Sequence, residues 1–131
     1  MAFEAFHSPK VKIKGDRPYS PAVRAGDWLL ISGQVSVDGE GNTVGKGDTE
    51  AQLRQCFENI KALVEEAGAT MADVAQIRIY ATDMGEFLRF HEMRREYFSP
   101  PYPSATGVEI SGLADPDWLI EVEAAAYLGG G

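Results

Sequence analysis

The sequence predicts an α+β fold, in which two helices pack on one face of a β-sheet. Two segments repeat apolar residues at spacings of three and four, as amphipathic helices do. Shorter segments with alternating or clustered apolar residues predict strands before, between and after these helices. A length of 131 residues suits one domain, spanning 1–131, with an ordinary hydrophobic core.

The N-terminal half predicts two strands followed by the longer helix. Residues 22–34, AVRAGDWLLISGQ, predict two short strands around a Gly-Asp pair. We expect Thr49 to cap the following helix, with Gln52 completing a capping box, and Gly68 to follow its last turn. The apolar stripe of this helix comprises Leu53, Cys56, Phe57, Ile60, Leu63, Val64 and Ala67.

The C-terminal half predicts a strand, the second helix and two more strands. Residues 74–82 alternate as a strand does, with Ile77, Ile79 and Ala81 on one face. Asp83 and Glu86 give a capping signal for a helix that ends before Pro100. This helix carries an apolar stripe of Phe87, Phe90, Tyr97 and Phe98. The last strands are expected at 108–111 and 119–127.

Composition excludes several classes of function. The formal net charge is −8 and no basic face is visible, so neither nucleic acid nor an anionic membrane is expected as a partner. The first 20 residues contain no long apolar run, which predicts neither a signal peptide nor a membrane span. The single Cys56 fits a reducing cytoplasm and, on the helix stripe, is expected to be a core residue. His/Cys spacings typical of metal sites do not occur in the sequence.

Several stretches, in this order, resemble the Rid family, also called the YjgF or RidA-like family. They are PYSPAV (18–23), LLISGQV (29–35), QLRQCFENIKALVEEAG (52–68), IYATDMGEFLRFHEM (79–93), VEISGL (108–113) and IEVEAAAYL (120–128). Founding members of this family hydrolyse reactive enamines and imines to ketoacids and ammonia. The resemblance implies a chorismate-mutase-like mixed sheet with two helices on one face, and a homotrimer with small-molecule clefts between subunits. No cofactor is expected, because the glycine-rich loop 39–47 lacks the ending of a P-loop and no metal-ligand pattern occurs.

Three residues match the family's cleft and indicate a catalytic site. Tyr19, in PYS, matches the active-site tyrosine, and Gly33, in SGQ, matches a glycine whose backbone lines the cleft. Glu121, in IEVE, matches the glutamate that positions or activates water. From the residues alone, Glu121 and Glu123 are better explained as two solvated acids on the outward face of a strand, and only the resemblance makes Glu121 a candidate base. Tyr19 and Gly33 likewise have structural alternatives, as an edge tyrosine and a strand-end glycine.

Three other positions depart from the family. Where its deaminases carry P-A-R-S, this chain has PSAT, so Ala105 replaces the arginine. His91 stands where an asparagine is frequent, and Pro21 where many members have glutamine. The arginine fork can hold a substrate carboxylate through two charge-assisted hydrogen bonds, each contributing about 1.5–3 kcal/mol, which alanine cannot replace. Efficient hydrolysis of 2-imino acids is therefore not expected.

The remaining cleft residues carry weaker signals. Thr106 and Gly107 follow Ala105, and their backbone is expected to help bind the substrate, in a cleft widened by the small side chains. His91 lies on the apolar stripe of the second helix, either as a half-buried structural histidine or as a proton donor or acceptor. Arg94 and Arg95 are possible substitutes for the missing cation, but neighbouring acids indicate solvated surface charges.

Two classes of function remain open from the sequence. The first is a small-molecule hydrolase or deaminase that uses Glu121 and Tyr19; the second is a non-catalytic trimeric module that binds a metabolite or a partner. Retention of Glu121 favours the first, and loss of the arginine favours the second. Endoribonuclease activity, which is attached by name to part of the family, is disfavoured by the acidic charge. A trimer is also expected to cover the free sheet face, to which we assign Leu29 and Ile31.

Overall fold

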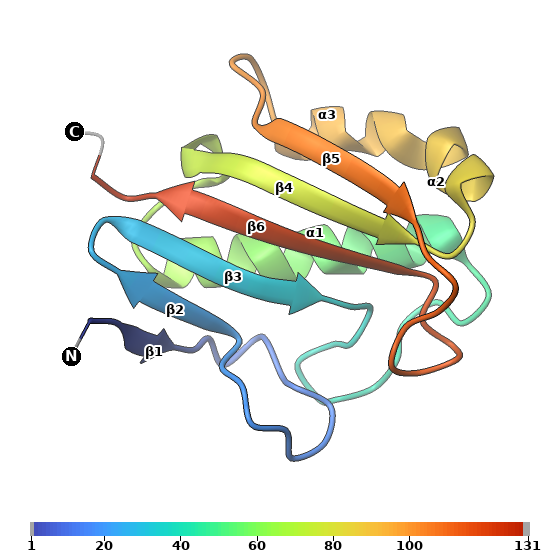
Figure 1. Cartoon of the computed structure of the whole chain (residues 1–131), viewed down its shortest axis with the longest axis horizontal. Helices are drawn as coiled ribbons and strands as arrows, with labels where there is room; N and C mark the ends of the chain where they lie inside the picture. The colour runs from blue at the N-terminus through green and yellow to red at the C-terminus, as the bar shows by residue number, and fades with distance from the viewer. Residues whose placement is uncertain (1, 130–131) are drawn as a thin grey trace.

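The structure, a computed structural model, describes residues 2–129. Its six strands form one sheet in the order β1-β2-β3-β6-β4-β5 (Figure 1). Only β4 and β5 are parallel neighbours, and the other pairs are antiparallel. The strands are β1 (Glu4–Phe6), β2 (Ala22–Ala25), β3 (Trp28–Gln34), β4 (Val74–Ala81), β5 (Ser104–Glu109) and β6 (Ile120–Tyr127). This arrangement confirms the predicted α+β mixed sheet.

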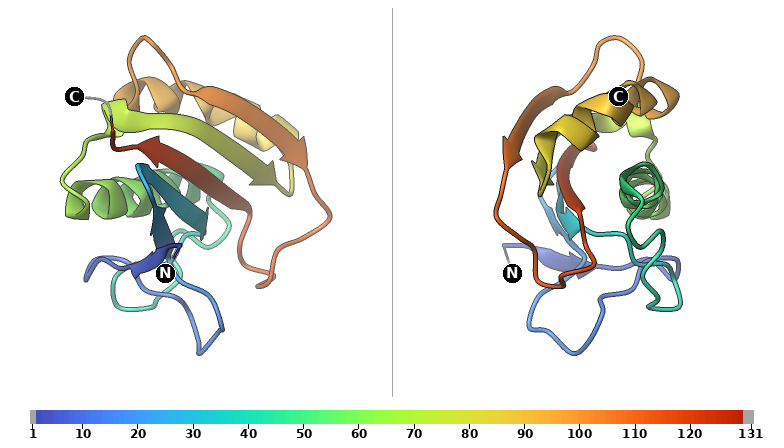
Figure 2. Two further views of the ribbon diagram at one scale, coloured as in Figure 1. Left: turned by 60° about the vertical axis from the view of Figure 1, so that its left-hand side comes forward. Right: turned by 90° about the vertical axis from the view of Figure 1, so that its right-hand side faces the viewer.

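Both helical layers lie on the same face of the sheet, as the sequence predicts (Figure 2). The long helix α1 (Thr49–Glu66) packs mainly against β6 and β3. The second helical region is divided into α2 (Met84–Phe90), a 3₁₀ turn η2 (His91–Met93) and α3 (Arg94–Tyr97). A further 3₁₀ turn, η1 (Met71–Asp73), leads into β4.

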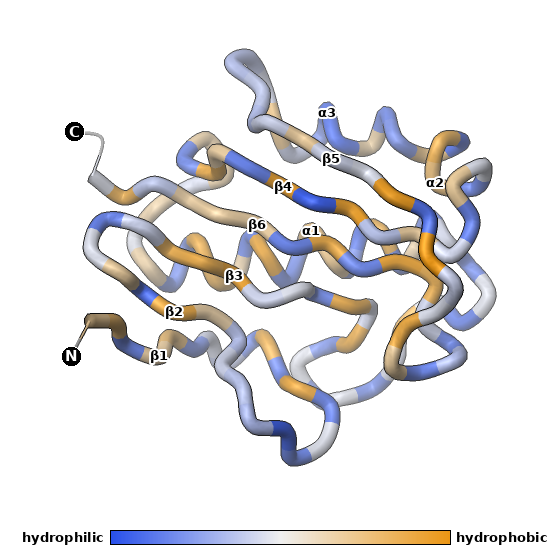
Figure 3. Tube along the Cα trace, in the orientation of Figure 1, coloured by the Kyte–Doolittle hydropathy of each residue, from blue (hydrophilic) through white to orange (hydrophobic). Residues whose placement is uncertain are grey.

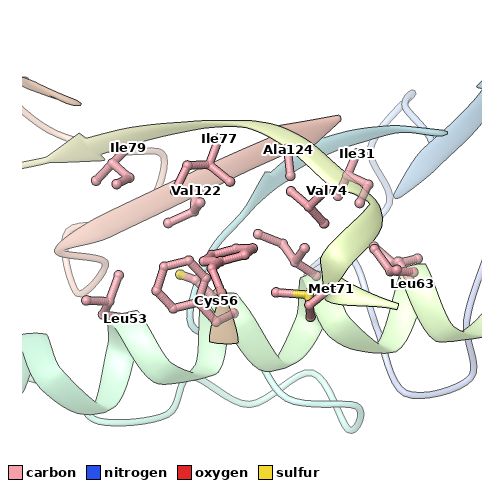
Figure 4. Packing of buried hydrophobic residues seen from close by; sticks show 14 of the residues in the cluster. Ile31, Leu53, Cys56, Leu63, Met71, Val74, Ile77, Ile79, Val122 and Ala124 are labelled. Carbon is pink, nitrogen blue, oxygen red and sulfur yellow. The ribbon is translucent and has the colours of Figure 1, made fainter. Parts of the chain in front are cut away.

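The core lies between α1 and the inward face of the sheet (Figure 4). Hydrophobic and hydrophilic positions alternate along β4, so that Ile77 and Ile79 face the helices (Figure 3). The stripe predicted for α1 is buried from Leu53 to Val64, including Cys56, whose exposure is 0%, whereas Ala67, the C-cap, is half-buried. Burial strongly raises the pKa of the Cys56 thiol, which keeps it protonated and unreactive.

The start of α1 differs from the predicted capping box. Asp48 is the N-cap, and its Oδ1 accepts a hydrogen bond from the Ala51 amide. Gln52 is instead buried, where its Nε2 donates to the carbonyls of Gly45 and Asp117 and its Oε1 accepts from the Leu119 amide. This side chain therefore fastens α1 to two loops. The end of the helix agrees with prediction, since Gly68 follows with φ +80°.

The uncovered sheet face carries other residues than those predicted. Leu29 and Ile31 point into the core, with exposures of 0% and 3%, so their assignment to the free face was wrong. Strand alternation places Trp28 and Leu30 on the opposite face, where their exposures are 40% and 45%. Tyr127 on β6 packs against Trp28 with ring centroids 5.1 Å apart. The face without helices therefore bears large exposed apolar side chains.

Candidate functional site

Glu121 lies on β6 and points to the sheet face that the helices leave uncovered. Its neighbours Ile120 and Val122 are fully buried on the inward face, which fixes the alternation. Glu121 is half-buried and pairs in register with Tyr80 of β4. The strand alternation predicted for Glu121 and Glu123 is confirmed.

Gly33 allows the carboxylate of Glu121 to lie against the backbone of β3. The pairing of β3 with β6 shifts in register between Ile31 and Gln34, at a β-bulge that contains Gly33. A Cβ atom on Gly33 would stand 2.6 Å from the carboxyl carbon of Glu121 and 2.7 Å from its Oε2. Only glycine leaves room for this side-chain position, so the two predicted residues form one local structure.

Tyr19 completes a first cluster with Gly33 and Glu121. Partial burial raises the pKa of its phenol, the positive charge of Arg17 lowers it, and the negative charge of Glu121 raises it. The hydroxyl therefore stays protonated near neutral pH and is available as a hydrogen-bond donor. A small cleft of about 20 Å³ has Tyr19, Gly33 and Trp118 among its walls.

Glu121 is adapted to accept a proton at a higher pH than an ordinary carboxylate. Its pKa is raised, first by burial and second by the negative charge of Glu123. Glu123 itself accepts a hydrogen bond from the hydroxyl of Tyr80, and its Oε1 lies 3.9 Å from Nη1 of Arg78. Arg78 and Tyr80 were not identified as site residues from the sequence. The alternation of β4 does place them on the outward face, away from Ile77 and Ile79.

A second cluster lies at the edge of the sheet, between β5 and the segment from α2 to α3. Ala105 pairs in parallel register with Ile77, and both residues line a cavity of about 220 Å³. His91, Arg94 and Arg95 line the same cavity from the helical side. We refer to it as the β5–α3 cavity.

The predicted site residues on β5 do not share one face of the sheet. They are the consecutive residues Ala105, Thr106 and Gly107. Gly107 pairs with Ile79, and a Cβ there would meet the Met84 side chain at 3.7 Å, so this position faces the helices as Ala105 does. Thr106 pairs with Arg78, on the outward face that also holds Glu121. The predicted site residues therefore fall into two groups. The outward-face group comprises Glu121 and Thr106, together with Gly33 and Tyr19, which lie close to Glu121. The second group comprises His91 and Ala105, which line the β5–α3 cavity, and Gly107, which faces the helices but is not among the lining residues.

Two contacts from the guanidinium of Arg94 fix the tautomer of the His91 ring. Nε of Arg94 donates to the carbonyl oxygen of His91, and Nη2 lies 3.1 Å from Nδ1 of the His91 ring. Because a guanidinium donates and cannot accept, Nδ1 must accept and the ring proton resides on Nε2. His91 is half-buried and presents its Nε2 N–H as a hydrogen-bond donor.

Arg94 differs from the solvated charge that its neighbours indicate, whereas Arg95 agrees with that prediction. Arg94 is half-buried and lies over the ring of Phe87, at 5.4 Å from its centroid. Arg95 is exposed and donates to Glu92, as expected, but its Nη1 also donates to the hydroxyl of Tyr102 at 2.7 Å. Their place beside Ala105 was not predictable from helical spacing, because it depends on how β5 packs along the helices.

Other polar residues have structural roles. Nδ2 of Asn59 donates to the carbonyls of Val35 and Val37, which anchors the loop after β3 on α1. Within residues 2–129, no group of three or more His, Cys, Asp or Glu side chains is arranged to hold a metal ion. In the same part of the chain, no helix has the length and apolar character needed to cross a membrane.

Comparison with known proteins identifies the fold and the family. The family described as endoribonuclease L-PSP matches residues 10–128. A RutC family protein of Pyrococcus horikoshii is 44% identical over 110 residues, which cover 84% of this chain and 86% of that protein. The crystal structure of RidA from an Antarctic Psychrobacter is 31% identical with a TM-score of 0.85, covering 95% of this chain and 98% of that one. Escherichia coli TdcF, solved with bound serine, is 26% identical with a TM-score of 0.84, covering 95% and 98%. The chain belongs to the Rid family, the endoribonuclease L-PSP family of YjgF/RidA-like proteins.

Proposed function

We propose that this protein is a small-molecule hydrolase or deaminase, with Glu121 as the group that positions and deprotonates water. The observation that carries the proposal is the carboxylate of Glu121, half-buried, with a raised pKa and held against the backbone of Gly33. A buried carboxylate with a raised pKa is suited to general-base catalysis near neutral pH. The neighbouring cleft of about 20 Å³ is large enough for about one water molecule.

The chemistry available to this cluster is the hydrolysis of a carbon–nitrogen double bond. The water oxygen forms a bond to the imine carbon while Glu121 accepts a water proton, and the C=N electron pair moves to nitrogen. Tyr19, which remains protonated, donates a hydrogen bond to the substrate. Glu121 returns the water proton to the nitrogen, which gives the carbinolamine. The hydroxyl proton of the carbinolamine then passes through Glu121 to the nitrogen as the C–N bond breaks, so that ammonia leaves and a carbonyl product remains. Neither an oxidant nor a metal is required by the atom balance of this reaction.

The substrate is proposed to be small and to differ from the usual 2-imino acids. Ala105 offers no donor on β5 to hold a carboxylate next to the reacting carbon. The serine bound by TdcF shows that one relative accommodates a small polar molecule. A non-catalytic binding module is the second candidate, favoured by the loss of the arginine. The net charge of −8 argues against RNA as a substrate and against an anionic membrane surface, and a buried Cys56 without a second cysteine fits a cytoplasmic location.

We expect the protein to be a homotrimer with its site between subunits. Within one chain the outward-face group and the β5–α3 cavity lie on opposite faces, so a second subunit is needed to bring them together. The uncovered sheet face also exposes three large apolar side chains, which contact with other subunits would bury: Trp28, Leu30 and Tyr127. Light scattering at micromolar concentration should give a mass about three times the 14.3 kDa of the chain. A mass near 14.3 kDa would contradict the trimer.

The rate of ammonia release should depend on pH through Glu121. A general base acts when deprotonated, so the rate should fall as the pH drops through the raised pKa of Glu121. Glu123→Gln removes the negative charge that contributes to this increase, so the acid limb of the profile should move to lower pH. Glutamine can still accept the hydrogen bond from Tyr80.

The profile is measured by coupled detection of ammonia from a panel of enamines and imines generated in solution. Glu66→Gln, at the exposed end of α1, is the control with the same change of charge. Its acid limb should coincide with that of the unmodified protein. An acid limb that moves equally in both variants would show that net charge, rather than the pair Glu121–Glu123, sets the profile. Absence of ammonia release from the whole panel would favour the binding module.

A further inference from the structure

We propose that Tyr80 is a positioning residue for the Glu121 reaction, whose hydroxyl holds the carboxylate of Glu123 in place beside Glu121. The inference rests on the proposed function in taking Glu121 as the base, and it assigns Tyr80 a role that acts through Glu123 rather than through contact with the substrate. The protonation of Glu121 can be followed without turnover, so the inference can be tested separately from catalysis.

The strand register places Tyr80 directly beside Glu121. Tyr80 of β4 pairs in antiparallel register with Glu121 of β6, and both side chains lie on the outward face of the sheet. Side chains that face each other across such a pair have Cβ atoms about 4.5–5.5 Å apart. The half-buried ring of Tyr80 therefore lies next to the stem of Glu121 and contributes to its burial, which is the largest cause of the raised pKa of Glu121.

The hydroxyl of Tyr80 extends past Glu121 to the next acid on the same strand face. Glu123 pairs in register with Arg78, so it is the diagonal neighbour of Tyr80. Diagonal neighbours on one face of a sheet remain within reach of an aromatic side chain. Across this diagonal the hydroxyl of Tyr80 donates a hydrogen bond to Oε1 of Glu123. This bond fixes the direction of the carboxylate and stabilises its negative charge next to Glu121.

Arg78 is a weaker partner of the same carboxylate oxygen. Its Nη1 lies 3.9 Å from Oε1 of Glu123, which is longer than a hydrogen bond. The side chain of Arg78 is 52% exposed, so water screens its charge. In the described part of the chain, Tyr80 is the only residue that donates a hydrogen bond to the Glu123 carboxylate. Loss of the Tyr80 hydroxyl therefore leaves Glu123 with only a long and screened contact.

The other ionisable groups around Glu121 do not duplicate the effect of Glu123. β3, the neighbour of β6 on the other side, contains no ionisable side chain. Cys56 of α1 lies behind the sheet, and its thiol is protonated because burial raises its pKa. Tyr19 is protonated as well, and Arg17 beside it is a cation, which would lower the pKa of a carboxyl group. The negative charge that raises the pKa of Glu121 is that of Glu123.

The test follows the titration of Glu121 in the full-length protein by ¹³C NMR with carboxyl-labelled glutamate. The resonance that is missing in Glu121→Gln identifies the group. Tyr80→Phe keeps the ring, and with it the burial of Glu121, but removes the hydroxyl. The titration midpoint of Glu121 should then move to lower pH, because Glu123 either takes up part of the incoming proton or turns away from Glu121. The shift should be a part of that produced by Glu123→Gln, and the acid limb of ammonia release should move in the same direction.

A double variant decides whether Tyr80 acts through Glu123. In Glu123→Gln the negative charge is already absent, so adding Tyr80→Phe should move the midpoint of Glu121 no further. A merely structural role of the Tyr80 hydroxyl would give the same shift in both backgrounds. A shift by Tyr80→Phe that persists in full beside Glu123→Gln would therefore overturn the inference, as would a Tyr80→Phe midpoint equal to that of the unmodified protein.

Tyr97→Phe is the matched control, because Tyr97 of α3 also donates a hydrogen bond from its hydroxyl to a glutamate. Its partner is Oε2 of Glu58 at 2.6 Å, in the helical layer away from Glu121. Tyr97→Phe should leave the midpoint of Glu121 unchanged, and an equal shift in both tyrosine variants would contradict a specific role of Tyr80. The expected shift without ammonia release from any substrate would refute the proposed function and keep the positioning of Glu123. Ammonia release that depends on Glu121, with a midpoint that ignores Tyr80→Phe, would do the reverse.

Discussion

Glu121→Gln is expected to lower the rate of ammonia release by about 10²- to 10⁴-fold, the usual contribution of a positioned general base. Glutamine has nearly the same shape, so it can occupy the space over Gly33 that only the absence of a Cβ provides. It cannot accept a proton from water. The effect should therefore appear in the rate, with the stability and oligomeric state of the protein unchanged.

The measurement compares single-turnover or steady-state ammonia release on the best substrate of the panel. Glu123→Gln is the matched control, because it changes the charge two residues away on the same strand face and keeps the proposed base. It should retain most of the rate at neutral pH. A Glu121→Gln variant that keeps its rate, folded and of unchanged mass, would remove Glu121 from the mechanism and leave the binding module as the better explanation.

The parts of the fold with strong periodicity were predictable from the sequence. The stripe of α1 from Leu53 to Val64 and the alternation of β4 and β6 each have one face that must be buried, so the pattern itself specifies the element. These elements form the core and fix the orientation of Glu121. The ends of elements were less predictable, because they depend on individual hydrogen bonds such as that from Ala51 to Asp48.

Elements stabilised by pairing with distant strands were missed or misplaced. β5 begins at Ser104, four residues before the predicted strand, because its first residues pair in parallel with β4 and carry no apolar signal of their own. β1, at Glu4–Phe6, was not predicted, and it exists through its ladder with β2. The second helix breaks at Phe90, with φ −116° and ψ 6°, although its apolar stripe is continuous.

The composition of the candidate site was predictable only in part. Alternation alone places Glu121 and Glu123 on one face, but it cannot show that Gly33 lies under the carboxylate of Glu121, which depends on a bulge between two strands. The residues that line the β5–α3 cavity were even less predictable from the sequence. The sequence order places Arg94 and Arg95 beside acidic neighbours, and only the packing of β5 along the helices shows that they also adjoin Ala105. The residue types therefore indicated candidate site residues from the sequence. Which of them lie together could be seen only from the strand register and from the packing of the strands on the helices.

Ala105→Arg is expected to raise hydrolysis of 2-imino acids by about tenfold or more from a near-background level. An arginine on β5 would supply two parallel donors to a substrate carboxylate, and a charge-assisted hydrogen bond contributes about 1.5–3 kcal/mol. Because Ala105 is exposed in the single chain and adjoins the β5–α3 cavity, space for the longer side chain is present. Glu92, on the opposite wall, offers a countercharge beside the existing Arg94 and Arg95.

The size of the gain depends on repulsion from the cations already present. A third guanidinium next to Arg94 and Arg95 raises the cost of placing positive charge there, and His91 replaces the asparagine frequent in relatives. We therefore expect the restored rate to remain below that of an arginine-bearing relative assayed at the same protein concentration. Combining Ala105→Arg with Arg95→Gln removes one of the competing cations, so the double variant should exceed Ala105→Arg alone if repulsion limits the gain.

The decisive comparison is Ala105→Arg with and without Glu121→Gln, on 2-aminoacrylate or its imine tautomer. If the arginine only improves the grip on the substrate carboxylate, its gain needs Glu121, and the double variant should return to background. Ala105→Lys serves as the control of equal charge without the planar fork, and its gain should be smaller. A folded trimeric Ala105→Arg variant with no gain on any 2-imino acid would show that the cleft is rebuilt for another substrate.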